Sequence, residues 1–224
     1  TFDLAADLGA GVGAVALLLC RGGVAARCAC VEAEPELAAL CRANAAANGL
    51  ADVVEVLGAD LRDPLSPRLE GACDLVVANP PYLPLAEGRA SPDPLRAAQR
   101  HELRGGLPDF VAAARRLLAP GGVLALIYRW RRQAFARETL AAAGFAVVRE
   151  RRHLPRAGAP PATVCFEATD GGACGTGPAA TPETLVLHEP GRRFSARVEA
   201  FLDGDYRSAS RNASSDTRPG RTMR

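Results

Sequence analysis

The stretch TFDLAADLGAGVGAVALLLC, residues 1–20, decides the fold of this chain. Its first part, Phe2–Leu8, is a short and mostly apolar run, which is typical of a buried β-strand. Glycine then stands at every second position from Gly9, and the residues from Gly13 to Cys20 favour a helix. A strand, a glycine turn and a helix in this order indicate an α/β fold that binds ligands at the carboxyl ends of its strands.

Strand and helix patterns alternate through the rest of the chain. They predict a mostly parallel sheet with helices on both faces, in one domain over residues 1–206. Residues 207–224 have no apolar periodicity, and we expect them to be disordered. The further strands expected are Arg27–Val31, Val53–Leu57, Asp74–Ala78, Val123–Tyr128, Phe145–Arg151 and Thr163–Ala168, with Thr184–His188 as an additional candidate. The expected helices are Pro35–Ala47, Leu107–Leu118 and Arg132–Ala143.

The composition is that of an ordinary globular protein. The chain has 224 residues, of which 48% are apolar and 23% charged, and it contains no apolar run long enough to span a membrane. The seven cysteines show no CxxC pair and no metal-site spacing with histidine, so we expect buried thiols in a cytoplasmic protein without a bound metal. All 27 basic residues are arginine. The chain begins within a strand and without methionine, from which we expect its native amino terminus to be missing.

The glycine turn predicts a nucleoside site but leaves the cofactor open. Gly9, Gly11 and Gly13 let the backbone approach a ligand closely, in front of the free amides that begin the next helix. Glu32 ends the second strand, where its carboxylate can accept both ribose hydroxyls. Read as G-x-G-x-x-A from Gly9, the pattern fits a dinucleotide. Read as D-x-G-x-G-x-G from Asp7, it fits S-adenosylmethionine, whose ammonium group Asp7 would help to hold.

A further acid follows the third strand. Asp60 can reach the exocyclic amine of an adenine there, although a helix cap or a surface acid fits the position equally well. Asp7, Glu32 and Asp60 thus lie at the carboxyl ends of three different strands. Because open parallel sheets bind ligands along the carboxyl edge, we expect these acids to serve one site.

The most specific chemical signal is DLVVANPPYLP, residues 74–84. Its apolar run is typical of a buried strand, which must stop at Asn79 because proline cannot donate to a sheet. A planar amino group is a poor nucleophile, and two acceptors on its N–H bonds would orient it: the side-chain oxygen of Asn79 and the carbonyl of Pro80. Pro81 restricts the backbone, and Tyr82 offers a face on which the planar group stacks. The tetrapeptide predicts methyl transfer to an amino group and has no use in hydride transfer.

These segments resemble a known family. DLGAGVGAV, VEAEP, GADLRD and VVANPPY are similar to class I S-adenosylmethionine-dependent methyltransferases of the amino-methylating type. NPPYLPLAEGRASPDPLRAAQRHE, LPDFVAAARRLLAPGG and LHEPGRRFSARVEAFLDGDY resemble the bacterial family that methylates adenine N6 in valine tRNA beside the anticodon. The resemblance covers residues 2–206. The family usually has a segment ahead of the first strand that helps to cover the cofactor, and we expect that segment to be missing here together with the native amino terminus.

The resemblance carries expectations about fold and site. It implies a Rossmann-like, mostly parallel sheet of seven strands in the order 3-2-1-4-5-7-6, with S-adenosylmethionine as cofactor. It also implies that Asp7, Gly9, Gly11, Glu32 and Asp60 line the cofactor, and that Asn79, Pro80 and Tyr82 hold the target amine.

Arginine dominates one later region of the chain. Eight arginines and two glutamates lie between Arg129 and Arg156. Such a region favours either a solvated surface or a patch that contacts phosphates. We expect a monomeric enzyme that methylates RNA, with tRNA as substrate and no membrane partner. The candidate RNA contacts are Arg129, Arg131, Arg132, Arg151 and Arg152.

Three other functions compete with this one. A protein glutamine methyltransferase acting on release factors can clamp a glutamine amide with the same tetrapeptide, but its following stretch differs from SPDP…RHE. DNA adenine methyltransferases usually carry a target-recognition domain, for which this chain has no room. An RNA-binding module with a vestigial cofactor fold is disfavoured by the intact Gly9, Gly11, Glu32 and Asn79.

Overall fold

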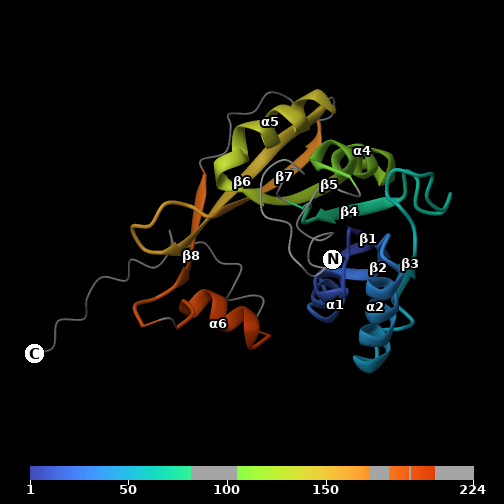
Figure 1. Cartoon of the computed structure of the whole chain (residues 1–224), viewed down its shortest axis with the longest axis horizontal. Helices are drawn as coiled ribbons and strands as arrows, with labels where there is room; N and C mark the ends of the chain where they lie inside the picture. The colour runs from blue at the N-terminus through green and yellow to red at the C-terminus, as the bar shows by residue number, and fades with distance from the viewer. Residues whose placement is uncertain (82–104, 172–181, 192, 205–224) are drawn as a thin grey trace, which may run out of the picture.

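The computed structural model describes residues 1–81, 105–171, 182–191 and 193–204 (Figure 1). Two of the sequence predictions, the stacking role of Tyr82 and the disordered tail at 207–224, lie outside the described residues. In the part that is described, no helix has the length and apolar character needed to cross a membrane.

Strands and helices alternate as the sequence pattern predicts. The strands are β1 (Phe2–Leu8), β2 (Ala25–Val31), β3 (Val54–Leu57), β4 (Cys73–Ala78), β5 (Leu118–Arg129), β6 (Phe145–Arg156), β7 (Thr163–Asp170) and β8 (Glu183–His188). The helices are α1 (Ala14–Arg21), α2 (Pro35–Ala47), α4 (Leu107–Leu117), α5 (Gln133–Ala142) and α6 (Ala196–Leu202), with a 3₁₀ turn, η2 (Trp130–Arg132), after β5. The sequence pattern did not indicate α6.

The described strands form one sheet in the order β3-β2-β1-β4-β5-β7-β6-β8. The first seven strands keep the expected order, but the expected total of seven is wrong, because β8 adds in parallel to the outer edge of β6. β1 pairs in parallel with both β2 and β4, and β4 pairs in parallel with β5. Only β7 runs the other way, antiparallel to β5 and β6. The carboxyl ends of the other seven described strands therefore point to one edge of the sheet.

Helices cover both faces of the sheet (Figure 1). Successive residues of β1 point to opposite faces, as the two-residue period of a strand requires. Ala5 packs in an apolar cluster with α1 and α2, whereas Ala6 and Leu8 pack in a larger cluster with α4 and α5. Since both faces of the central strands are buried, their near-continuous apolar sequences are explained.

Several cysteines belong to this packing. Cys28, Cys30, Cys41 and Cys73 are fully buried and free. Burial raises the pKa of the Cys41 thiol to about 12 and that of Cys73 to about 11. The thiols of Cys41 and Cys73 are therefore protonated at neutral pH and act as small apolar side chains.

β6 is longer than the sequence pattern predicts. It was expected to end at Arg151 but continues to Arg156, because β7 pairs with one of its edges and β8 with the other. Paired backbone on both sides stabilises the end of this strand, where charged residues are frequent. Because the residues after Arg151 are mostly polar or proline, the sequence pattern did not predict that the strand continues.

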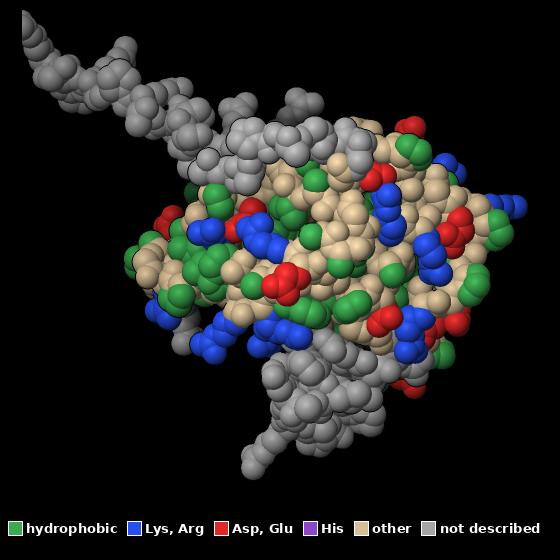
Figure 2. Space-filling model, turned by 90° about the horizontal axis from the view of Figure 1, so that it is seen from above, with side chains coloured by type: hydrophobic (Ala, Val, Ile, Leu, Met, Phe, Trp, Pro, Cys, Tyr) green, Lys and Arg blue, Asp and Glu red, His purple; other side chains and the backbone are tan. Residues whose placement is uncertain are grey.

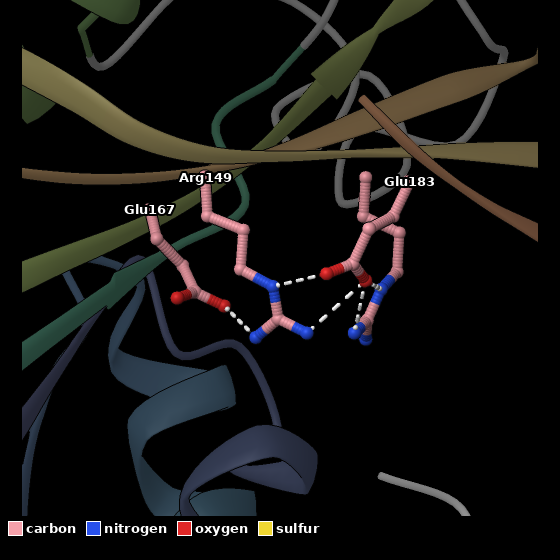
Figure 3. Close-up of polar contacts among 4 residues, drawn as sticks. Arg149, Glu167 and Glu183 are labelled. Atoms are coloured by element: carbon pink, nitrogen blue, oxygen red, sulfur yellow. Dashed lines mark hydrogen bonds and ion pairs between the residues drawn. The ribbon is translucent and has the colours of Figure 1, made fainter. Parts of the chain in front are cut away.

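An ionic network joins β6, β7 and β8 (Figure 3). The Arg149 guanidinium donates to Glu167 of β7 at 2.9 Å and to Glu183 of β8 at 2.9 and 3.1 Å. Arg151 donates to the same Glu183 carboxylate at 2.8 and 3.0 Å. Glu183 thus separates two like charges and connects the last strand to the sheet.

We predict that Glu183→Gln weakens the attachment of β8. Neutralising this carboxylate leaves Arg149 and Arg151 side by side, and we expect a loss of about 1–2 kcal/mol in unfolding free energy for a partly exposed network. The measurement is urea denaturation at low and high salt, with Glu138→Gln on the exposed side of α5 as the matched control. Equal stability of the two variants would show that the network contributes nothing.

Candidate active site

A cavity of about 430 Å³ lies at the carboxyl edge of the sheet, around the loops that follow β1, β2, β3 and β4. Its volume falls within the range of about 300–1,000 Å³ that is usual for small-molecule sites. Residues from the start of α4 complete the wall. The described lining residues are Asp7, Gly9, Ala10, Gly11, Val12, Ala14, Val15, Val31, Glu32, Ala33, Glu34, Leu37, Ala59, Leu61, Asn79, Pro81, Gly105 and Phe110.

Asp7 is the buried acid of this cavity. Its side chain is only 4% exposed, and its Oδ2 atom has no hydrogen-bond partner among the described residues. Burial raises the pKa of Asp7 to about 7; the backbone amide of Ala16 opposes this shift and the nearby Glu32 adds to it. A buried carboxylate oxygen without a donor is costly, so the site is built for a donor that arrives with a ligand.

Glu32 holds the glycine turn in place. Its Oε2 accepts a hydrogen bond from the Gly11 amide at 2.7 Å, and its Oε1 accepts one from the Glu34 amide at 2.8 Å. Each carboxylate oxygen can accept a second bond, so ribose hydroxyls remain possible partners. The structure therefore gives Glu32 a positioning role that the sequence pattern did not reveal.

The three glycines of the turn have different surroundings. All three have positive φ, at 65° for Gly9, 57° for Gly11 and 84° for Gly13. A Cβ on Gly11 would meet no atom within 4 Å, whereas a Cβ on Gly9 would lie 3.0 Å from the Phe110 ring. A Cβ on Gly13 would lie 2.5 Å from the Cys41 sulfur, and Gly13 is not among the lining residues. Gly13 thus serves the contact between α1 and α2.

Phe110 is a site residue that the sequence analysis missed. It lies in the first turn of α4, is 5% exposed, and contributes its ring to the cavity beside Gly9. The Asp109 carboxylate accepts a bond from the Gly106 amide at 2.8 Å and fixes the start of this helix. In the sequence Phe110 is one apolar residue in a helical pattern, so no local signal marks it.

Asp60 lies beside the cavity but faces elsewhere. Its carboxylate pairs with the Arg62 guanidinium at 2.6 Å, while its chain neighbours Ala59 and Leu61 line the cavity. The contact with adenine that the sequence suggests would require Asp60 to turn from Arg62 toward the cavity.

The Asn-Pro-Pro segment follows β4 directly. Leu8 of β1 lies opposite Ala78 of β4, so Asn79 comes level with Gly9 of the glycine turn. Asn79 is exposed and lines the cavity together with Pro81, while Pro80 between them is buried. The structure thus brings the glycine turn, Asp7 and Asn79 to one cavity.

Among the described residues, the charged side chains that line the cavity are all acidic. Three carboxylates, those of Asp7, Glu32 and Glu34, line the cavity, and the described lining contains no cationic side chain. The described residues also contain no group of three or more His, Cys, Asp or Glu side chains placed to hold a metal. Such a lining favours a positively charged ligand and disfavours the pyrophosphate of a dinucleotide.

Of the five candidate RNA contacts, four lie at or near the carboxyl edge of the sheet, while Arg151 lies on the opposite face of β6 from Arg152. Arg129, Arg131 and Arg132 lie at the carboxyl end of β5 and in η2, at the same edge as the cavity. Arg152 lies on the α5 side of β6, where it donates to Glu150. Neighbouring residues of a strand point to opposite faces, so Arg151 lies on the other side, in the network with Glu183.

Comparison with known families assigns this architecture. The model of the methyltransferase small domain matches residues 2–149. Among solved structures, that of a predicted O-methyltransferase from Agrobacterium tumefaciens is similar, with a TM-score of 0.65 and 22% identity over 90% of this chain and 89% of that one. This likeness shows a shared Rossmann-like methyltransferase fold.

The relatives with named activities include methyltransferases that act on different substrates. A tRNA1(Val) (adenine(37)-N6)-methyltransferase of Porphyromonas gingivalis is 37% identical over 54% of this chain and 48% of its own length. A release factor glutamine methyltransferase of Mycolicibacterium smegmatis is 42% identical over 56% and 41%. The chain thus spans about half the length of these relatives. A second tRNA1(Val) (adenine(37)-N6)-methyltransferase, from Parabacteroides distasonis, is 27% identical over 89% of this chain and 81% of its own length.

We predict that Asp7→Asn changes how stability depends on pH. Unfolded aspartate ionises near 3.8 and folded Asp7 near 7, so the folded state binds the proton more tightly. Stability therefore falls as pH rises from about 4 to 7, by on the order of 3–4 kcal/mol from this group. Asn cannot ionise and should remove this part of the slope.

The measurement is urea unfolding at a series of pH values without added ligand. Asp52→Asn, at an exposed position of the loop before β3, is the matched control and should keep the wild-type profile. If the Asp7→Asn profile also follows the wild type, Asp7 does not carry the raised pKa.

Proposed function

The chain belongs to the methyltransferase small domain family, and from this membership we propose that it methylates the exocyclic N6 amine of an adenine in RNA. The methyl donor of this family is S-adenosylmethionine. The proposed substrate is tRNA, at the adenine beside the anticodon of valine tRNA, as the names of the relatives suggest.

The cavity fits the donor by charge and by shape. S-adenosylmethionine carries an ammonium group and a sulfonium centre, which suit a lining with three carboxylates and no described cation. We propose that the orphaned Oδ2 of Asp7 accepts a hydrogen bond from the ammonium group. Glu32, held by the amides of Gly11 and Glu34, would accept from the ribose, and Gly11 leaves room for close approach.

Asn79 and Pro80 would orient the amine. Its lone pair is delocalised into the ring, and two acceptors on its N–H bonds favour the tetrahedral geometry that attack requires. Bound S-adenosylmethionine supplies an electrophilic methyl group: the amine nitrogen forms the new N–C bond while the C–S bond breaks and its electron pair stays on sulfur. The nitrogen then loses one proton to water. Positioning therefore supplies most of the catalysis, and a strong base is not required.

The basic part of the carboxyl edge supports RNA as the substrate. Arg129, Arg131, Arg132 and Arg152 lie at the edge that carries the cavity, where phosphates beside a target base would come to rest. An unpaired anticodon-loop base can leave its stack at low cost. The match to a tRNA-modifying relative covers 89% of the chain and so extends beyond the residues 2–149 that the family model matches.

Glutamine methylation of release factors is the second candidate. It is supported by the 42% identity to the Mycolicibacterium smegmatis relative, which is higher than the identity to the tRNA-modifying relatives, although it extends over only 56% of the chain. The same two acceptors would orient a glutamine amide.

We predict that Asn79→Ala lowers methyl transfer to tRNA by on the order of a hundredfold, because it removes one of two aimed acceptors. The reaction is followed with methyl-labelled S-adenosylmethionine, unmodified tRNA and, separately, purified release factor. The product is identified as N6-methyladenosine after digestion of the RNA.

Asn48→Ala, at the exposed end of α2, is the matched control and should retain full activity. Asn48→Ala should bind S-adenosylmethionine with the wild-type affinity, and the affinity of Asn79→Ala should lie within a few fold of that value. Label in the release factor alone would overturn the proposal in favour of the second candidate, and label in neither substrate would overturn both.

A further inference from the structure

The guanidinium groups of two arginines at the carboxyl edge lie over aromatic rings. The Arg152 guanidinium lies over the indole of Trp130, 4.8 Å from the ring centre, and Arg132 lies over Phe135 at the same distance. Trp130 and Arg132 belong to the 3₁₀ turn η2, which directly follows β5. Figure 2, which views the molecule from above, shows arginine side chains (blue) interspersed with hydrophobic ones (green) on the face that it presents.

A buried acid fixes the first of these stacks. Glu150 is 3% exposed and accepts a hydrogen bond from Arg152 Nε at 2.9 Å, while Arg137 of α5 forms an ion pair with its other oxygen. Arg152 is thus held by a carboxylate at one side and by an indole below. Its side chain is still 37% exposed, so the guanidinium presents an ordered cationic plane to solvent. Little side-chain entropy is left to lose when a ligand binds this plane.

The strand register sets the distance of this stack from the acceptor site. Arg152 lies level with Val164 of β7 and Tyr128 of β5, and Leu126 of β5 lies level with Ala78. Arg152 is therefore three strands from β4 and close to the level of Asn79. At about 4.8 Å per strand, the separation is on the order of 15 Å. A single strand of RNA whose target base enters the cavity covers this distance within a few nucleotides.

We propose that the Arg152–Trp130 stack binds an unpaired base that flanks the target adenine. The inference rests on the proposed function and adds a second contact point for the same RNA strand. The guanidinium plane stacks on the base, its charge attracts the neighbouring phosphate, and the indole keeps the plane in place. An acidic peptide would use the charge but not the planar face, so the planar arrangement favours RNA.

Trp130 allows a direct test, because it is the single tryptophan of the chain. We titrate the full chain with unmodified valine tRNA and follow the intrinsic fluorescence of Trp130. A base stacked on Arg152 should quench this fluorescence with saturation, and added salt should reverse the effect. Heparin, an anion without bases, is the control and should bind without the same quenching. Equal quenching by heparin, or none by tRNA, overturns the proposal.

Arg152→Lys keeps the charge and removes the plane. We expect about a tenfold rise in KM for tRNA, the effect of losing one stacked base, with kcat and the Kd for S-adenosylmethionine unchanged. Arg21→Lys, at the end of α1 on the opposite edge of the sheet, is the matched control and should keep the wild-type KM. Trp130→Phe should abolish the fluorescence signal and raise KM less than Arg152→Lys does.

The assays separate the two levels of inference. If wild-type protein methylates tRNA and Arg152→Lys has the same KM, the flanking-base site is wrong and the proposed function stands. If wild-type protein transfers no methyl group to tRNA, the proposed function fails and the flanking-base site fails with it. If the KM for tRNA is raised in both Arg152→Lys and Arg152→Gln but equals the wild-type KM in Arg21→Lys, the result supports the site.

Discussion

The parallel pairing of β1 with both β2 and β4 is the constraint on which the site depends. Parallel neighbours end at the same edge, so three loops that are distant in sequence meet there: the glycine turn after β1, Glu32 after β2 and Asn79 after β4. The bond from the Gly11 amide to Glu32 then locks the first two loops together. A slip by one residue in either pairing would move every side chain of that strand to the other face and separate these groups.

The sequence predicted those elements whose pattern of residues lies within a short stretch of the chain. The strand before Asn79, the turn at Gly9 and the helix from Pro35 each have their own pattern of residues within a few positions, and these elements were predicted. Longer-range contacts have no such pattern. Phe110 enters the cavity only because α4 packs over β1, and Gly13 meets Cys41 only because α1 lies beside α2. β8 extends the sheet by pairing with β6, and its Glu183 contacts two arginines of that strand; no spacing in the sequence reveals these long-range contacts.

The burial of acidic groups in the cavity destabilises the folded protein when no ligand is bound. Asp7 and Glu32 raise each other's energy when both are charged, and the raised pKa of Asp7, about 7, is the result of burial together with that repulsion. A cation that enters the cavity offsets both effects and lowers the pKa of Asp7 again. Its binding should therefore release a proton near neutral pH, and its affinity should fall as the pH drops below about 7.

The carboxyl edge of the sheet is divided by charge, and this division suits two ligands of opposite sign. Carboxylates from the end of β1 and from the loop after β2 line the cavity, while arginines of η2 and β6 occupy the other half of the edge. Asn79, which is neutral, lies on the border between them. If the proposed function holds, a cationic methyl donor and a polyanionic RNA would each be attracted to one half and repelled by the other, and their reacting groups would meet at Asn79. The extension of β6 beyond Arg151, supported by its pairing with β7 and β8, adds Arg152 to the basic half, so residues 2–149, which the family model matches, contain that half only in part.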